Sequence, residues 1–187
     1  MPGGGFAREF IDVHVVPHLA TLLTRGIRVV ANAGGVDPAG CAEALRKAAT
    51  AAGLSLVEAA AARTVDVPSA AQSLVGKVDV IYAPTDNNVM SAFEGIVKVA
   101  QQARLPLVAA DTDAVKRGAV AALGLNYYDL GRQTGKVVVR VLKGEAPGTI
   151  ASQVSSSFEL HVNPAAAQKQ GVALSDELLK TAKVVVK

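Results

Sequence analysis

Four short polar segments each follow a run of apolar or β-branched residues, and they hold the side chains best suited to contact a ligand. Amide, hydroxyl and carboxylate groups dominate them, and two glycines allow a close backbone approach. The segments are residues 32–35, 84–87, 111–113 and 126–128. From the first three we predict this ligand-binding set: Asn32, Gly34, Gly35, Thr85, Asp86, Asn87, Asp111 and Thr112.

Charge indicates the chemistry of that ligand. Asp86 and Asp111 suit an ammonium group. A helical pattern follows each segment, and the unpaired N–H groups and partial positive charge of a helix N-terminus favour a carboxylate or phosphate. The expected partner is therefore a small anionic or zwitterionic solute. Capping is the alternative explanation, because Asp and Asn are preferred at the position that begins a helix.

No catalytic residue, metal site or cofactor is predicted. Gly34 and Gly35 resemble a phosphate-binding loop, but neither GxGxxG nor GxxxxGK[ST] is present, and a tight turn explains them as well. His14 and His18 are spaced like metal ligands on a helix. Pro17 distorts that turn, however, and no other Cys or His stands nearby.

Two further residues with reactive side chains are better explained by structure. Cys41 lies on the apolar face of its expected helix, as a buried thiol does. His161 lies in an expected edge strand with no partner in view. One cysteine cannot form an intramolecular disulfide.

Composition argues against nucleic acid and membranes as partners. The net charge of +3 is small and scattered, and Lys116 and Arg117 are expected on a solvated face. No segment reaches the roughly 18 apolar residues that span a bilayer. The N-terminus lacks the basic and apolar regions of a secretory signal, so as written the chain is expected in the cytoplasm.

The scaffold behind these segments is expected to be an α/β fold, because short strands alternate with helical patterns. We predict a flavodoxin-like or Rossmann-like doubly wound parallel sheet of about five strands in the order 2-1-3-4-5. The expected strands are 27–31, 54–60, 78–82, 107–110 and 119–123. The expected helices are 38–52, 66–75, one that holds residues 89–100, 113–117 and 128–142. In such sheets ligands bind beyond the carboxyl ends of the strands.

The whole chain, 1–187, is expected to be a single domain with extra pieces on both sides of a core at 27–143. The N-terminal piece, 1–26, is helical in pattern. The C-terminal piece, 144–187, holds a linker rich in Gly, Pro and Ser, an edge strand at 158–162 and two helices that start near Asn163 and Ser175.

Residues 54–187 resemble the C-terminal half of substrate-binding proteins of ABC transporters, which have the periplasmic-binding-protein type I fold. The resemblance is carried by "AAQSLVGKVDVIYAPTDNNV", by "LPLVAADTDAVKRGAVAALGLNYYDLGRQTGKVVVRVLKGEAPG" and by "FELHVNPAAAQKQGV". It implies one lobe of a two-lobed protein that closes on a small solute, with some members similar to binders of aromatic amino acids. It also implies that Asp86, Asn87, Asp111 and Thr112 face the cleft.

The first part of the chain suggests a different origin. Residues 1–53, with "IRVVANAGGVDPAG", resemble a piece of the acyclic terpene utilisation family. The two resemblances meet near Gly53, so we predict a chimera, engineered or naturally recombined. The first lobe of the substrate-binding family would then be missing, and the helix at 128–142, which packs on that lobe in the family, would need a new partner.

We therefore expect a non-enzymatic, single-lobe solute-binding protein without a retained physiological function. Two alternatives remain open: a weak binder of a small amino acid or carboxylate, and an enzyme fragment acting on an acyl or phosphorylated substrate through residues 32–35. A missing nucleophile and base count against the enzyme. A homodimer is expected through the helix at 128–142 and the strand at 158–162, unless the N-terminal segment covers the same surface.

Overall fold

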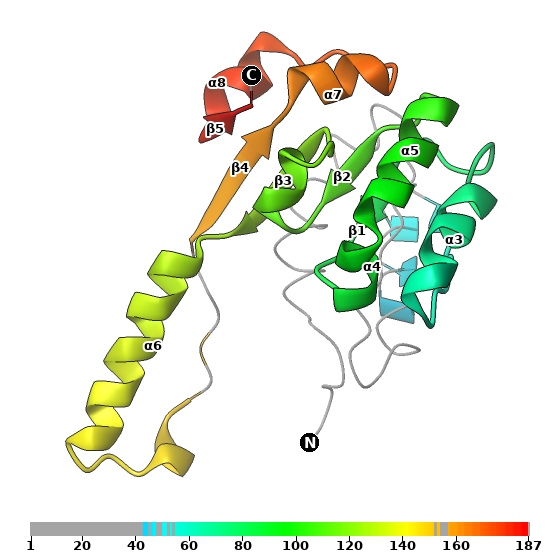
Figure 1. Ribbon diagram of the computed structural model, residues 1–187. Helices are drawn as coiled ribbons and strands as arrows, with labels where there is room; N and C mark the ends of the chain where they lie inside the picture. The colour runs from blue at the N-terminus through cyan, green and yellow to red at the C-terminus, as the bar shows by residue number, and fades with distance from the viewer. Residues whose placement is uncertain are drawn as a thin grey trace.

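The computed structural model describes residues 43–44, 46–47, 50–51, 53, 55–151, 153 and 157–186 (Figure 1). The predictions for the N-terminal segment, for the strand at 27–31 and for the helix that begins at residue 38 lie wholly or largely outside these residues. The same holds for six single residues: His14, His18, Asn32, Gly34, Gly35 and Cys41.

A five-stranded sheet organises the described residues, in the spatial order β1-β2-β3-β4-β5. Strands β1 (Ile81–Ala83), β2 (Leu107–Ala109) and β3 (Ala121–Leu125) pair in parallel, and β4 (Phe158–Val162) joins β3 antiparallel. The register places Ile81 beside Leu107, and Leu123 beside Leu160. The predicted α/β class and the neighbour order of the last three core strands are confirmed.

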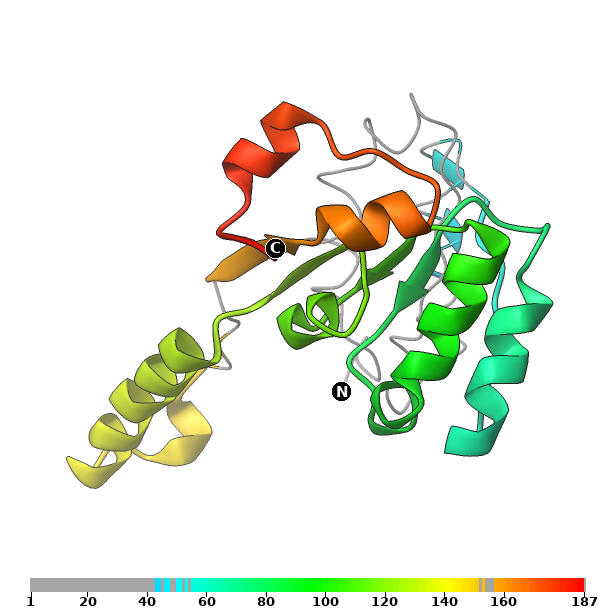
Figure 2. The same cartoon turned by 45° about the horizontal axis from the view of Figure 1, so that its top comes forward.

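Helices α3 (Val67–Ser73) and α5 (Phe93–Ala103) lie side by side and pack against the sheet (Figures 1 and 2). The apolar stripe predicted between residues 89 and 100 is buried throughout, with Phe93 and Ala100 fully enclosed. It belongs to two helices and not one, because Ala92 leaves helical geometry between α4 (Asn87–Ser91) and α5. Each fully buried apolar side chain contributes roughly 1.5–3 kcal/mol, so this face anchors both helices.

Sequence periodicity predicted a strand at 54–60, yet residues 55–61 are assigned neither strand nor helix. A strand is defined by hydrogen bonds to a neighbouring strand. In the predicted order that neighbour is the run at 27–31, which lies outside the described residues. Short 3-10 turns complete the core part of the chain, η3 (Thr64–Asp66) and η4 (Thr112–Val115).

The C-terminal region confirms two predicted helix starts and corrects one prediction. Helix α7 (Pro164–Lys169) begins at Asn163 and α8 (Asp176–Thr181) at Ser175, and both cap residues accept a backbone N–H. Strand β4 is not an edge strand, because β5 (Val184–Val185) pairs with it in parallel. A strand of two residues is too short to give a clear sequence pattern.

Helix α6 (Tyr127–Leu142) extends away from the sheet, and the turn η5 (Pro147–Thr149) returns beside it (Figures 1 and 2). The predicted inward stripe of α6 is therefore not buried in the core: none of its residues is buried, and Val138 is 49% exposed. Its periodicity indicated an apolar face correctly. Periodicity could not show that this face points away from the sheet.

Candidate ligand-binding site

The carboxyl ends of β1, β2 and β3 each lead into a residue whose side chain begins the next helix. These residues are Asp86 before α4, Asp111 before η4 and Asn126 before α6. Because the three strands are parallel neighbours, the three caps follow consecutive strands at the same edge of the sheet. The structure thus places the predicted segments after β1 and β2 where the sequence predicted them.

Asp86 uses one carboxylate oxygen as a cap. Its Oδ1 accepts the backbone N–H groups of Asn88 at 2.9 Å and Val89 at 3.0 Å. Within the described residues no hydrogen bond to Oδ2 is present. Asp86 is half-buried, whereas its predicted site neighbours Thr85 and Asn87 are exposed. The capping explanation is therefore correct for Asp86, and it leaves one oxygen for a ligand.

Asp111 repeats this arrangement on the next strand. Its Oδ1 accepts the Asp113 N–H at 2.9 Å, and Thr112 follows as the first residue of η4. The loop lies tightly against Gly124 of β3: a Cβ added there would meet the Ala110 carbonyl oxygen at 2.8 Å and Thr112 Cγ2 at 2.9 Å. The absence of a side chain at Gly124 is therefore what lets β3 approach the Asp111 loop so closely.

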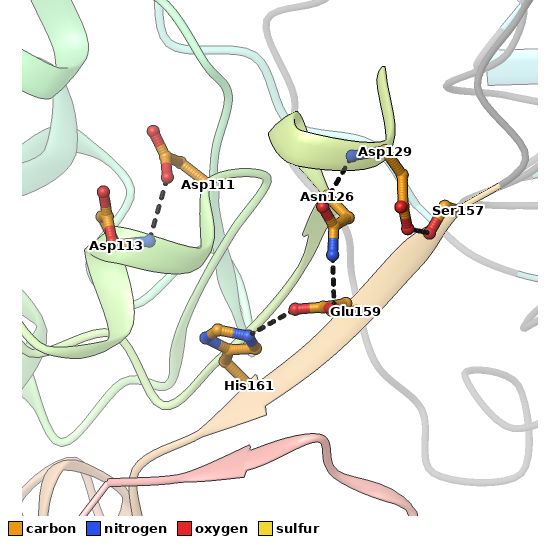
Figure 3. A network of polar contacts seen from close by, with 7 residues as sticks. All are labelled: Asp111, Asp113, Asn126, Asp129, Ser157, Glu159 and His161. Atoms are coloured by element: carbon orange, nitrogen blue, oxygen red, sulfur yellow. Dashed lines mark hydrogen bonds and ion pairs between the residues drawn. The ribbon is translucent and has the colours of Figure 1, made fainter. Parts of the chain in front are cut away.

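A third group of polar contacts surrounds the start of α6 (Figure 3). Asn126 Oδ1 accepts the Asp129 N–H at 3.0 Å, while its Nδ2 donates to Glu159 Oε1 at 2.7 Å. Glu159 Oε2 lies 3.3 Å from His161 Nε2, and Ser157 Oγ donates to Asp129 Oδ2 at 2.9 Å. The contacts join the two points where the chain leaves the sheet and returns to it.

Electrostatics favour the ionised form of Glu159. Its pKa is lowered from the ordinary value chiefly by the hydrogen bond from Asn126, then by the one from His161 and by the positive charge of Lys183. No partner for His161 was predicted from the sequence, whereas in the structure it contacts Glu159. Glu159 itself was not predicted as a site residue. The spacing of Glu159 and His161 could have indicated this contact, because alternate residues of a strand lie on the same face of the sheet.

Arg117 connects the loop after β2 to the helices after β1. Its guanidinium donates to both carboxylate oxygens of Glu94, at 2.7 and 2.9 Å, and to the Met90 carbonyl oxygen at 2.8 Å. It also lies over the Phe93 ring, 5.1 Å from the centroid. This hydrogen bonding lowers the pKa of the Glu94 carboxyl group from its ordinary value. Lys116 is exposed, as expected of a solvated face, whereas Arg117 is half-buried and hydrogen-bonded.

A groove of about 350 Å³ lies elsewhere, between α6 and the chain that returns beside it. Leu130, Val137 and Val141 line one side, and Pro147 and Ile150 line the other.

Among the described residues no group of three or more His, Cys, Asp or Glu side chains could hold a metal ion. Over the same residues, the structure contains no helix with both the length and the apolar character of a membrane span.

Comparison with known proteins gives the family. The sequence model of the family described as ABC transporter substrate binding protein matches residues 15–186. A tyrosine-binding protein of Clostridioides difficile is 30% identical over 167 residues, which cover 87% of this chain and 48% of that protein. An uncharacterized protein of Rickettsia prowazekii is 26% identical over 113 residues, 60% of this chain and 37% of the relative. The chain spans about half the length of these curated relatives or less.

Solved structures agree with this result. A conserved domain protein from Vibrio cholerae is similar at a TM-score of 0.78 and 37% identity, over 91% of this chain and 58% of that one. An ABC domain from Streptococcus pneumoniae in complex with L-Trp is similar at a TM-score of 0.74 and 28% identity, over 90% of this chain and 60% of that one.

These matches correct two predictions. The family match begins at residue 15 and continues across residue 53, so neither a chimera nor a segment from the terpene utilisation family has support. Members of the matched family bind substrates and are not enzymes, so the enzyme-fragment alternative is wrong as well. The chain belongs to the ABC transporter substrate-binding protein family.

Proposed function

We propose that this chain recognises the ammonium group of an aromatic amino acid at the carboxyl edge of β1–β3, with Asp86 and Asp111 as the charged ligands. The observation that carries the proposal is their shared arrangement. Each carboxylate uses Oδ1 to begin a helix or turn, and in the described residues Oδ2 of each has no hydrogen-bond partner. Two such oxygens, which follow neighbouring parallel strands, suit a cation that carries several N–H donors.

The same caps argue against these two loops as the place for the ligand carboxylate. The Asn88 and Val89 N–H groups of α4 are already bonded to the Asp86 side chain, and the Asp113 N–H group of η4 is bonded to that of Asp111. Both elements are also short, at five and four residues, so their dipoles are small. The charge at this edge therefore favours the positive end of a zwitterion over an anion.

The aromatic class of the ligand is supported by the relatives. One relative is named a tyrosine-binding protein, and one similar structure holds L-Trp. Their identities to this chain, 30% and 28%, support the class of ligand without selecting between the two amino acids.

A titration of the chain with L-Trp and L-Tyr tests the proposal. The two carboxylates contact only the ammonium group of a ligand, whereas small-molecule sites bury most of the ligand surface. We therefore expect a dissociation constant no tighter than roughly 1 mM. The chain contains no Trp and three Tyr, so L-Trp fluorescence excited at a wavelength that Tyr does not absorb can be followed without a protein background.

Two substitutions remove charge and retain the caps, because Asn caps a helix about as well as Asp. Asp86→Asn and Asp111→Asn should each weaken binding by about tenfold, as expected for the loss of one hydrogen bond to a charged group. Asp176→Asn is the matched control, since Asp176 is an exposed first-turn residue of α8. Unchanged affinity in both site variants would contradict the proposal.

A further inference from the structure

The Arg117 side chain reaches from the segment that follows Asp111 to the helix that follows Asp86. Asp86 begins α4, and Met90, whose carbonyl oxygen accepts from Arg117, is a residue of the same short helix. Arg117 itself follows η4, the turn that Asp111 begins. One guanidinium thus connects the segments that hold both candidate ligands of the ammonium group.

The geometry of Arg117 is fixed from several directions. The fork of two hydrogen bonds to Glu94 sets the plane of the guanidinium, and the fully buried Phe93 ring supports its face. Such bidentate pairs add geometric specificity, and Lys cannot reproduce them. The positive charge also interacts favourably with Asp111, which raises the pKa of Arg117 together with the larger contribution from Glu94.

We propose that Arg117 is a positioning residue of the amino-acid site, which holds the Asp111 loop against the helix that Asp86 begins. It sets the relative position of the two carboxylates and does not itself contact the ligand. This inference rests on the proposed function, because it concerns how the ammonium group is recognised.

If Arg117 had a purely structural role, its substitution would give a different result from the one that a positioning role predicts. Loss of a structural contact lowers the thermal midpoint and weakens every ligand alike. Loss of a positioning contact lowers the preference for ligands that carry an ammonium group. The informative quantity is therefore the ratio of the dissociation constants of desaminotyrosine and L-Tyr, which differ only in that group. Ligand-observed NMR measures both constants in the millimolar range.

The test compares Arg117→Met with Arg140→Met. Arg140 forms a similar fork with Glu145 at the far end of α6, with Nε 2.7 Å from Oε2, so the control removes the same kind of ion pair. Wild type should prefer L-Tyr by about tenfold, as expected for hydrogen bonds to a charged group. Arg117→Met should reduce this preference by about threefold or more, and Arg140→Met should leave it unchanged, since exposed ion pairs contribute little.

Each outcome decides the matter. If wild type prefers L-Tyr and Arg117→Met keeps the full preference, the positioning role is refuted and the proposed function stands. If wild type shows no preference, the proposed function fails, and the positioning role fails with it. Should Arg117→Met not fold, Arg117→Gln is the second variant. It removes the positive charge and the fork to Glu94 and keeps a polar side chain at this half-buried position, so the same reduction in preference is expected.

Discussion

Asn126 Nδ2 donates to Glu159 Oε1 at 2.7 Å, and this bond joins the residue that begins α6 to the strand that returns from it. Ser157 makes a second connection to the first turn of α6 through Asp129. The base of α6 is thus fixed at two points, although none of its residues is buried. Side-chain hydrogen bonds therefore help to set where this helix leaves the sheet.

Glu159→Gln should change how stability depends on pH. The pKa of Glu159 is lowered in the folded chain, chiefly by the Asn126 hydrogen bond, so the folded state binds this proton less readily than the unfolded state. The stabilisation is present above the unfolded pKa and is lost as the pH falls through the folded one.

Urea unfolding at a series of pH values measures this effect. Glu159→Gln should lower the free energy of unfolding at neutral pH, and its difference from wild type should shrink as the solution becomes acidic. Glu177→Gln, at an exposed position in the first turn of α8, is the control. A difference that is constant over the whole pH range would contradict the assigned role of the carboxylate.

Gly124→Ala should destabilise the fold and displace the Asp111 loop. The new methyl group would meet the Ala110 carbonyl oxygen at 2.8 Å and the Thr112 backbone nitrogen at 3.1 Å. Overpacking a buried position costs about 1–3 kcal/mol. Denaturant unfolding measures the cost, and L-Tyr affinity should fall together with stability.

Gly131→Ala provides the matched control for that substitution. An added Cβ at Gly131 meets no atom within 4 Å, and the residue lies inside α6. Ala is favoured over Gly in a helix by about 1 kcal/mol, so this variant should be neutral or slightly more stable. Equal effects at the two glycines would contradict the close approach of β3 to the Asp111 loop.

Gln170→Leu should destabilise strongly, because Gln170 is fully buried and bonded at both ends of its amide. Its Oε1 accepts the Leu107 N–H at 2.7 Å, and its Nε2 donates to the Gly118 carbonyl oxygen at 2.8 Å. Leu would leave both backbone groups without this partner, at a cost of about 3 kcal/mol in total. Gln168→Leu, at an exposed position of α7, should change the free energy of unfolding by less than about 0.5 kcal/mol.

Local signals predicted much of the chain correctly. The caps Asn163 and Ser175 and the apolar stripe through Phe93 each depend on residues a few positions apart, and the structure confirms them. The order of β1, β2 and β3 followed from the repeated strand and helix pattern, because parallel crossovers restrict the topology.

Distant pairings were missed. Arg117 and Glu94 lie 23 residues apart, and Asn126 and Glu159 lie 33 residues apart. No local pattern selects such partners, since they depend on strand register and loop packing. β4 was placed at the edge of the sheet for the same reason: its outer neighbour β5 has two residues and no periodicity. The capping roles of Asp86 and Asp111 followed from residue type, since Asp is preferred where a helix begins, and their role as ligands stays a prediction.

Leu142→Ala should leave stability almost unchanged, although Leu142 is a large apolar residue at the end of the amphipathic helix α6. The side chain is 80% exposed, and exposed substitutions usually change the free energy of unfolding by less than about 0.5 kcal/mol. Leu107→Ala is the comparison, because Leu107 is fully buried in β2 and its truncation should cost about 2–5 kcal/mol. Urea unfolding of both variants measures the contrast. A loss at Leu142 close to that at Leu107 would mean that another surface covers α6 in solution. Repeating the measurement at several protein concentrations would then separate a second copy of the chain from a contact within one molecule, since only association depends on concentration.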